Sequence, residues 1–307
     1  MRILITGATG FIGSHLVTRL AAEHEIFALI RRTPPTPLAN VHYIVQDLRE
    51  PLDRNQLPDE LDAIIHQAAL IDTDTVADSG AASAENSGAT QDALPFLVNV
   101  VATWRLLEYA AEANVQSFIH ASTGGIYGCR DHQFDEGDRP NPMDLYSLTK
   151  AQAELAVRSA PGTFHKIILR YFFPYGKGTP NPIPSYIRRA VLGEPIDILA
   201  GGGPRFNPLH IADAIEATVR ALELADSTTL NIAGTEVTTF AEIARLAAAA
   251  VGREPHFNII PDETAIPYYR ADLIASTIEM SAVLGFVPKW SLQDGIAELA
   301  ASYYNSP

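Results

Sequence analysis

Short, nearly continuous apolar runs alternate with helical patterns through the first two-thirds of the 307-residue chain. Such runs are typical of parallel strands that are covered by helices on both faces. Parallel strands are joined by right-handed helical crossovers, so the alternation predicts an α/β fold with a doubly wound parallel sheet. The predicted strands are Arg2–Thr6, Glu25–Ile30, Val41–Gln46, Asp62–Gln67, Ser117–Ala121 and Lys166–Arg170, and the predicted helices include Gly10–Ala22, Ala93–Ala113 and Leu145–Ser159.

The pattern changes after Tyr171, where prolines cluster and shorter strands mix with helices. We therefore predict a first domain over residues 1–171 and a smaller, mixed α/β C-terminal lobe over residues 172–307, with the chain crossing between them. The strands expected in the lobe are Ile196–Leu199, Thr229–Ile232 and Phe257–Ile260, and its helices are Ala212–Leu224, Thr239–Val251 and Leu292–Tyr304.

The segment from Ile71 to Asp92 consists almost entirely of Ala, Ser, Thr, Asp and Gly and has little to bury. Two interpretations remain open for it. It is either a surface loop without fixed structure or a mobile flap over a cleft, because long loops in compact domains often act as lids.

The net charge of −14 makes nucleic acid and anionic membrane poor partners, since the chain repels phosphate. The single cysteine, Cys129, cannot form an intramolecular disulfide, as expected in a reducing compartment. No basic, cleavable leader precedes the first apolar run, and no uncharged run is long enough to span a bilayer. We expect a cytoplasmic protein. His66, His120 and His210 lack metal-ligand spacing, so we expect no metal.

A glycine-rich turn joins the first strand to the first helix, in the order Thr6-Gly7-Ala8-Thr9-Gly10-Phe11-Ile12-Gly13. Glycines in this position let backbone N–H groups approach a pyrophosphate, and the helix N-terminus adds roughly half a positive charge. Because the turn opens a strand–helix–strand unit, it predicts a Rossmann-type dinucleotide-binding domain that takes NAD or NADP.

The second strand ends in Leu29-Ile30-Arg31-Arg32, without the carboxylate that would bind the adenosine ribose of NAD. Two arginines stand where the 2′-phosphate of NADP would lie, so we predict that NADP is preferred and that NAD is possible. Asp47, after the third strand, is placed to accept a hydrogen bond from the adenine amino group. An aspartate at a strand end is also an ordinary helix cap, and that alternative stays open.

Tyr146 and Lys150 are four residues apart and share one face of a predicted helix. A tyrosine whose pKa is pulled towards neutrality by a neighbouring cation is the acid/base that hydride transfer to a carbonyl needs. Ser122 and Thr123 add hydroxyls at the carboxyl end of a parallel strand, where ligands of such sheets bind.

Several motifs in order along nearly the whole chain resemble the extended short-chain dehydrogenase/reductase family, the NAD(P)-dependent epimerase/dehydratase group. They are Gly7-x-x-Gly10-x-x-Gly13, Asp47-Leu48, His66-Gln67-Ala68-Ala69, Ser122-Thr123, Ile126-Tyr127-Gly128, Tyr146-x-x-x-Lys150, Leu169-Arg170-Tyr171-Phe172 and Leu284-Gly285-Phe286-x-Pro288.

The resemblance implies a role for each site residue. Tyr146 would be the acid/base, Thr123 and less surely Ser122 would bond the reacting oxygen, and Lys150 would hold the nicotinamide ribose. Asn99 would match an active-site asparagine, with a locally bonded helix residue as the alternative. The implied cofactor-binding set is Gly7, Thr9, Gly10, Phe11, Ile12, Gly13, Arg31, Arg32, Asp47, Leu48, Ala68, Ala69, Tyr146, Lys150 and Tyr171. The resemblance also implies a homodimer formed by the helices Ala93–Ala113 and Leu145–Ser159.

The chain departs from nucleotide-sugar members of the family in its substrate lobe. Phe173 stands in place of an asparagine, and Phe206 in place of an arginine, with Arg205 adjacent. Losing charge-assisted donors costs about 1.5–3 kcal/mol each, so a diphosphate would bind poorly unless Arg205, Arg188 or Arg270 compensates. We expect Thr123, Phe173, Arg205 and Phe206 to meet a less polar small-molecule substrate. Gly124-Gly125 replaces the acidic pair of the family's dehydratases, which argues against dehydration.

These features together predict an NADP-preferring oxidoreductase that interconverts a secondary alcohol and a ketone. One alternative is a nucleotide-sugar epimerase with retained NAD(P), because epimerisation oxidises and re-reduces the same carbon. Another is a non-catalytic NADP-sensing regulator, against which the set of Thr123, Tyr146 and Lys150 argues.

Overall fold

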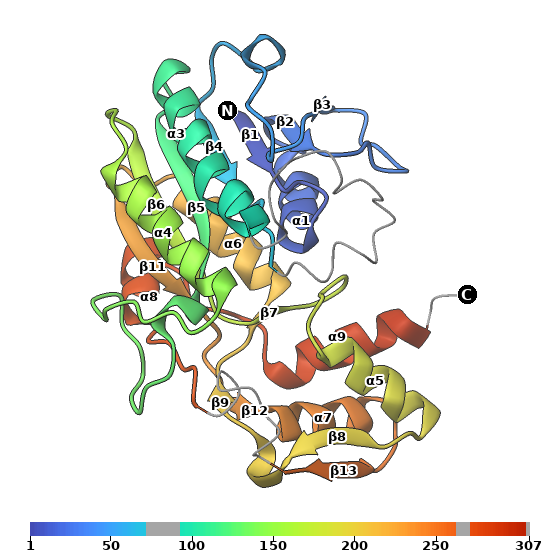
Figure 1. The fold of residues 1–307 in the computed structure, drawn as a ribbon. Helices are drawn as coiled ribbons and strands as arrows, with labels where there is room; N and C mark the ends of the chain where they lie inside the picture. The colour runs from blue at the N-terminus through green and yellow to red at the C-terminus, as the bar shows by residue number, and fades with distance from the viewer. Residues whose placement is uncertain (72–92, 262–270, 305–307) are drawn as a thin grey trace. The chain divides into compact units, whose positions relative to one another are not determined.

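The computed structural model describes residues 1–71, 93–261 and 271–304 (Figure 1). The chain divides into two compact units and passes between them several times. Unit 1 comprises residues 1–126, 144–169 and 219–229, and unit 2 comprises residues 127–143, 170–218 and 230–307. This division is finer than the single boundary expected after Tyr171. Apart from Ile71, the segment Ile71–Asp92 with its two interpretations lies outside the described residues.

A seven-stranded sheet with the order β11-β6-β5-β4-β1-β2-β3 confirms the predicted doubly wound arrangement. The pairings β1 with β2, β1 with β4, β2 with β3 and β4 with β5 are all parallel. Thr6 lies opposite His66, and His66 opposite His120, so the carboxyl ends of β1, β4 and β5 meet at one edge. The strands are β1 Arg2–Thr6, β2 Glu25–Ile30, β3 Val41–Val45, β4 Ala63–His66, β5 Ser117–Thr123, β6 His165–Tyr171 and β11 Thr228–Ile232.

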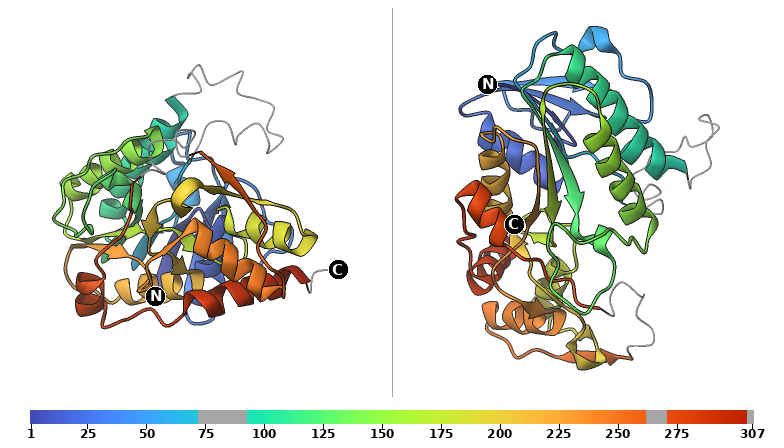
Figure 2. Two further views of the ribbon diagram at one scale, coloured as in Figure 1. Left: turned by 90° about the horizontal axis from the view of Figure 1, so that it is seen from below. Right: turned by 90° about the vertical axis from the view of Figure 1, so that its left-hand side faces the viewer.

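Helices cover both faces of the sheet in unit 1, with α3 and α4 on one face and α1 on the other (Figure 2, right). Their bounds are α1 Phe11–Leu20, α2 Leu94–Phe96, α3 Ala102–Glu112 and α4 Leu145–Ser159, and a 3₁₀ turn spans Arg54–Gln56. Apolar side chains of β1, β4, β5 and α3 form the core between these layers, including Leu4, Ile64, Phe118 and Leu106.

The predicted helix Ala93–Ala113 is interrupted, because residues Leu97–Val101 form a π-helical stretch between α2 and α3. Asn99 lies in this stretch with its side chain buried. Its amide donates to the Leu70 carbonyl at 2.9 Å and its carbonyl accepts from the Leu70 N–H at 2.8 Å. Single π-turns of this kind often occur at functional sites.

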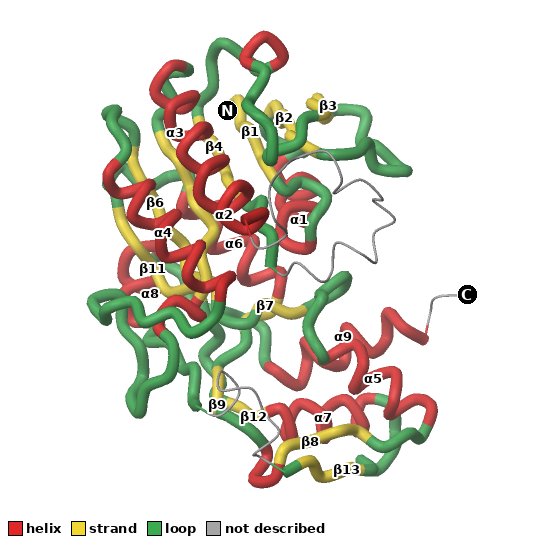
Figure 3. The backbone as a smooth tube through the Cα atoms, viewed as in Figure 1, coloured by secondary structure: helices red, strands yellow, loops and turns green. Residues whose placement is uncertain are grey.

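Unit 2 contains α5, α7 and α9, which pack together beside the pair β8 and β13 (Figure 3). Its core includes Tyr175, Ile187, Ile243 and Leu299. The elements assigned to the second half of the chain are β7 Pro174–Tyr175, α5 Ile183–Leu192, β8 Ile196–Leu199, a 3₁₀ turn Ala200–Gly202, β9 Arg205–Phe206, β10 Leu209–His210, α6 Ile211–Ala221, β12 Thr238–Thr239, α7 Phe240–Ala250, β13 Phe257–Ile260, α8 Ile278–Leu284 and α9 Leu292–Tyr304. Within the described ranges no helix is both long and apolar enough to cross a membrane.

The sequence analysis did not predict α5, which begins among the prolines that cluster after Tyr171. Proline suits the first turn of a helix, where its missing N–H has no partner to lose, and Pro184 occupies such a position. Gly193 ends the helix in the left-handed conformation, a frequent helix stop.

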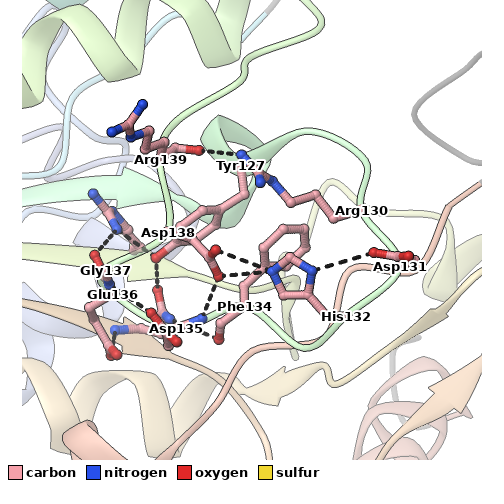
Figure 4. A network of polar contacts seen from close by, with 12 residues as sticks. Tyr127, Arg130, Asp131, His132, Phe134, Asp135, Glu136, Gly137, Asp138 and Arg139 are labelled. Atoms are coloured by element: carbon pink, nitrogen blue, oxygen red, sulfur yellow. Dashed lines mark hydrogen bonds and ion pairs between the residues drawn. The ribbon is translucent and has the colours of Figure 1, made fainter.

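A buried polar network ties the loop of residues 128–143 to the rest of unit 2 (Figure 4). The buried Arg170 guanidinium donates to the Tyr127 hydroxyl at 2.5 Å and lies over its ring. Tyr127 in turn donates to Asn231 Oδ1 at 2.8 Å, and Glu136 accepts from the Asn231 N–H at 2.7 Å. The loop leaves unit 1 after a 3₁₀ turn at Gly124–Tyr127 and returns just before α4.

Candidate active site

The glycine-rich turn brings three backbone segments of unit 1 into close contact. Gly7 has a φ of +65°, and a Cβ atom there would lie 2.6 Å from the Ala68 nitrogen. A Cβ atom on Gly13 would lie 2.1 Å from the Gly7 carbonyl oxygen. Helix α1 starts at Phe11 with Gly10 as its N-cap, so no side chain covers the first-turn N–H groups. The turn therefore has the form of an anion cradle at a helix N-terminus.

A pocket of about 310 Å³ opens beside this turn, at the lower end of the range for ligand pockets. It brings together predicted cofactor residues from the turn after β1 and from the segments that follow β2, β3 and β4. Its lining is Gly7, Thr9, Gly10, Leu29, Ile30, Arg31, Gln46, Asp47, Leu48, Arg49, Gln67, Ala68, Ala69, Leu70, Leu94 and Val98. Phe11, Ile12 and Gly13 form the adjoining first turn of α1 but do not line the pocket.

Arg31 and Arg32, directly after β2, occupy different positions at this site. Arg31 lines both the pocket and a second hollow next to it, which also contains Thr9, Ser14 and Tyr43. Arg32 lines only the second hollow. Arg31 is therefore the arginine that connects the two spaces.

Asp47 is held by a residue that sequence reasoning missed, Arg49. Its Oδ2 accepts from Arg49 Nε at 2.9 Å and from Nη2 at 2.6 Å, and its Oδ1 accepts from the Arg49 N–H at 2.9 Å. Burial alone would raise the pKa of Asp47, but the hydrogen bonds and charge of Arg49, with the charge of Arg31, lower it. The only sequence signal was an arginine two residues after the predicted ligand. A carboxylate has further lone pairs, so its contact with adenine stays a prediction.

Tyr146 and Lys150 lie on α4, whose start is fixed by Asp144. The Asp144 side chain accepts from the Ser147 N–H at 2.7 Å and from its hydroxyl at 2.8 Å, an N-cap. One turn on, Lys150 is only 1% exposed, and its Nζ donates to His120 Nε2 on β5 at 3.2 Å. Tyr146 is partly exposed.

The pKa of Tyr146 is shifted opposite to the expected direction, and the pKa of Lys150 is shifted as well. Burial, with repulsion from Asp144, raises the pKa of Tyr146 to about 12. Burial lowers the pKa of Lys150 to about 7, with Glu154 acting in the other direction. The prediction that Lys150 pulls the pKa of Tyr146 towards neutrality is therefore wrong for the protein by itself. Loss of hydration is the largest cause of both shifts.

The two hydroxyls at the end of β5 face different surroundings. The buried Ser122 donates to Glu154 Oε1 at 2.6 Å, so its proton is already used. Thr123 is partly exposed and accepts from the Gly125 N–H at 3.1 Å, which leaves its own proton for another acceptor. Of the two, Thr123 is the better placed to bond a reacting oxygen.

The side chain of Asn99 forms hydrogen bonds within the protein. Besides its bonds with Leu70, its amide donates to Thr149 Oγ1 at 2.9 Å, and it is fully buried. These partners lie 29 and 50 residues away in sequence, so the alternative of a locally bonded helix residue is wrong, and a role for Asn99 in the active site stays a prediction. Its part is to tie the π-helical stretch to α4.

Tyr171, expected to bind cofactor, belongs to unit 2. Its ring is buried, and its hydroxyl pairs with Thr218 Oγ1 at 2.7 Å. Packing against α6 accounts for this residue, so we withdraw it from the cofactor-binding set.

The substrate residues expected in the lobe also need correction. Phe206 is 4% exposed and packs on Phe240 with ring centroids 4.6 Å apart, so it belongs to the core and not to a substrate pocket. Arg205 donates to Asp272 Oδ2 through Nε at 2.9 Å and Nη2 at 2.6 Å, which neutralises the charge expected to meet substrate. Of the other two named substitutes, Arg188 lies on α5 and Arg270 lies outside the described residues.

Phe173 differs from these two residues. It is partly exposed, and its φ of +45° is rare for a bulky residue. Its ring packs 4.8 Å from Phe206 and 5.4 Å from Phe240, contacts that offset the cost of the conformation. It remains a candidate for contact with substrate. Thr123 belongs to unit 1 and Phe173 to unit 2.

His66 on β4 and His120 on β5 are part of buried packing. His66 bonds Thr6 Oγ1 at 2.6 Å and Thr103 Oγ1 at 2.9 Å, and burial lowers its pKa to about 3. Across the described parts of the chain, no three His, Cys, Asp or Glu residues are grouped to hold a metal ion.

Comparison with known proteins places this site in context. Residues 3–233 match the model of the NAD dependent epimerase/dehydratase family. A dTDP-4-dehydro-6-deoxy-D-allose reductase from Streptomyces bikiniensis is 28% identical over 97% of this chain and 94% of its own. A probable UDP-glucuronate 4-epimerase from Rhizobium meliloti is 30% identical over 99% of this chain and 97% of its own. The structure of UDP-glucuronic acid 4-epimerase from Bacillus cereus in complex with UDP-glucuronic acid and NAD aligns over 98% of both chains, with a TM-score of 0.83 and 25% identity.

Replacing Gly13 with Ala should disrupt the turn, because the new methyl group would meet the Gly7 carbonyl. Overpacking of this kind costs about 1–3 kcal/mol. We expect a lower urea midpoint and weaker binding of NADP and NAD. Gly10→Ala is the matched control in the same turn, since its methyl group would meet the Gly7 oxygen at 3.1 Å. Equal midpoints for the two variants would contradict the argument.

Proposed function

Because the chain belongs to the NAD-dependent epimerase/dehydratase family, we propose that it is an NADP-preferring oxidoreductase that interconverts a secondary alcohol and a ketone by hydride transfer. The observation that carries the proposal is the pair on α4: Tyr146 is partly exposed, one turn from the buried Lys150. The nucleotide pocket, at the same edge of the sheet as the end of β5, supports the same reading.

The unit 1 pocket fits a dinucleotide. The turn at Gly7, Gly10 and Gly13 would hold the pyrophosphate, because a Cβ atom at Gly7 or Gly13 would collide with neighbouring backbone. Asp47 would accept from adenine. When bound, the cofactor supplies the hydride donor or acceptor at nicotinamide C4.

Arg31 supports the preference for NADP. A guanidinium can bind the 2′-phosphate through two parallel hydrogen bonds, and no carboxylate follows β2 to repel it. The overall charge of −14 works against binding an anion, so a local cation is needed. The Bacillus cereus relative was solved with NAD, and NAD remains a possible cofactor here.

The protonation of the pair favours ketone reduction at neutral pH. With a pKa of about 12, the Tyr146 hydroxyl carries its proton and can donate it to the ketone oxygen. Lys150, in its charged form, would stabilise the phenolate that remains. Thr123 would donate a hydrogen bond to the same oxygen. Oxidation of the alcohol requires the phenolate first, so its rate should rise with pH.

Exposed apolar side chains on α3 and α4 support a homodimer. The two helices lie side by side in unit 1 (Figure 1), and Leu145, Leu148 and Leu155 follow one face of α4. Trp104 on α3 and Val101, the last residue of the π-helical stretch before α3, are also exposed. A second copy presenting the same surface would cover both rows around a twofold axis.

A nucleotide-sugar epimerase with retained cofactor is the second candidate, favoured by the 30% identity to a probable UDP-glucuronate 4-epimerase. The two candidates differ in net redox change. An epimerase would copurify with stoichiometric cofactor and interconvert nucleotide sugars at constant NADPH. An oxidoreductase would consume NADPH with a ketone from a panel that includes nucleotide-linked ketosugars.

Tyr146→Phe tests the proposed chemistry. We expect at least a 10²-fold loss of turnover with nearly unchanged NADP affinity, because only the proton donor is removed. Ketone-dependent NADPH oxidation measures turnover, and calorimetry measures affinity. Tyr303→Phe, at an exposed position on α9, is the control. Full activity of the Tyr146 variant would show that the proton takes another route.

Arg31→Ala tests the cofactor preference. Native protein should bind NADP at least tenfold more tightly than NAD, about 1.4 kcal/mol, and the variant should lose most of this difference. Arg32→Ala should lose less, because Arg32 lines only the outer hollow. Calorimetric titrations of each protein with NADP and with NAD provide the dissociation constants. Tighter binding of NAD by the native protein would refute the preference.

Leu155→Glu tests the dimer. Leu155 is 64% exposed, and a charge there should raise the dimer dissociation constant at least tenfold, about 1.4 kcal/mol. Leu192→Glu on α5 is the matched control, with 57% exposure. Light scattering across a dilution series measures the effect. A monomeric native protein, or equal effects of both variants, would contradict the proposed interface.

A further inference from the structure

Four side chains of different chemistry recur at every fourth residue of α4: Tyr146, Lys150, Glu154 and Arg158. This spacing places them in a row on one helix face. Lys150 and Glu154 are 1% and 2% exposed, whereas the Arg158 side chain is 46% exposed. A buried carboxylate therefore lies between the buried ammonium and a guanidinium that reaches solvent.

Both oxygens of Glu154 have partners on defined elements. Oε1 accepts from the Ser122 hydroxyl at 2.6 Å, and Oε2 pairs with Arg158 Nη2 at 3.0 Å. Arg158 also donates to Thr229 Oγ1 at 3.1 Å. Glu154 thus links α4 to the end of β5, one residue before Thr123.

The groups that face Lys150 come from three elements. Tyr146 and Glu154 lie on its own helix, and His120 on β5 receives its hydrogen bond. His66 on β4 lies behind His120, with ring centroids 5.4 Å apart. Burial and the charge of Lys150 lower the pKa of both histidines, so both are neutral at neutral pH. Glu154 supplies the negative charge among these groups.

We infer that Glu154 is a positioning residue for the proposed catalytic pair, which keeps the buried Lys150 in its charged form and holds Ser122 at the end of β5. The catalytic role of Glu154 rests on the proposed function. The charge of Lys150, however, can be measured without turnover. Burial drives the pKa of Lys150 down to about 7, and the charge of Glu154 opposes this shift. Without that charge, the amine would be neutral at the pH where Tyr146 must donate its proton.

Glu154→Gln tests the inference on the whole protein without substrate. The chain has four lysines, Lys150, Lys166, Lys177 and Lys289, so ¹³C labelling at Cε gives few NMR signals, and Lys150→Met identifies the one of interest. We expect the Lys150 pKa to fall by about one unit or more, a tenfold change in proton affinity. In ketone reduction, the fall of kcat at high pH should move to lower pH by the same amount, with the KM for NADPH unchanged.

Two further variants separate charge from packing. Glu154→Asp keeps the charge on a shorter side chain, and the Lys150 pKa should lie between those of native protein and Glu154→Gln. Arg158→Met removes the opposing cation, so the Lys150 pKa should rise or stay the same. The thermal midpoint of Glu154→Gln shows whether that variant folds. If it does not fold, the Lys150 pKa in Arg158→Met is the measurement that tests the inference.

An unchanged Lys150 pKa in folded Glu154→Gln, or a fall in Arg158→Met, would overturn the inference. A role in packing alone would lower the thermal midpoint without moving the titration. If the titration moves as expected but native protein reduces no ketone, the proposed function fails and the inference about the charge of Lys150 holds.

Discussion

The close approach of backbone around Gly7 is the constraint on which unit 1 depends. Gly7 touches the chain after β4, and Gly13 in α1 touches Gly7, so β1, β4 and the start of α1 are fixed together without side chains between them. The parallel register then brings the ends of β4 and β5 to the same edge. One steric requirement thus shapes the glycine turn and aligns the strand ends that carry the rest of the candidate site.

Burial opposes the charged form of side chains in both halves of the candidate site, but the net result differs. Beside the unit 1 pocket, Arg49 and Arg31 keep Asp47 charged despite partial burial. Along α4, burial prevails and opposes the charge of both Lys150 and Tyr146. A protonated phenol beside a lysine near its titration point suits proton donation to a ketone. The carboxylate of Glu154 then limits how far burial can neutralise the lysine.

The second unit carries the clearest departures from nucleotide-sugar members of the family. Phe206 and Phe240 fill the core, and Arg205 is paired with Asp272. Phe173 keeps a left-handed backbone because its ring packs on both phenylalanines. A change at Phe173 would therefore alter the acceptor side with little effect on the nucleotide pocket, which lies in unit 1.

Local signals in the sequence were sufficient for six strands of the sheet, the glycine turn and the span of α4, because strand period, helix period and glycine sterics act over a few residues. They wrongly placed Thr229–Ile232 in the C-terminal lobe, whereas β11 pairs with β6 at the edge of the seven-stranded sheet. They could not show that Ser122 bonds Glu154, 32 residues away, or that Lys150 bonds His120. They also gave the wrong direction for the Tyr146 pKa and the wrong surroundings for Phe206. Hydration and burial depend on which distant segments cover a side chain, and only the tertiary structure decides that.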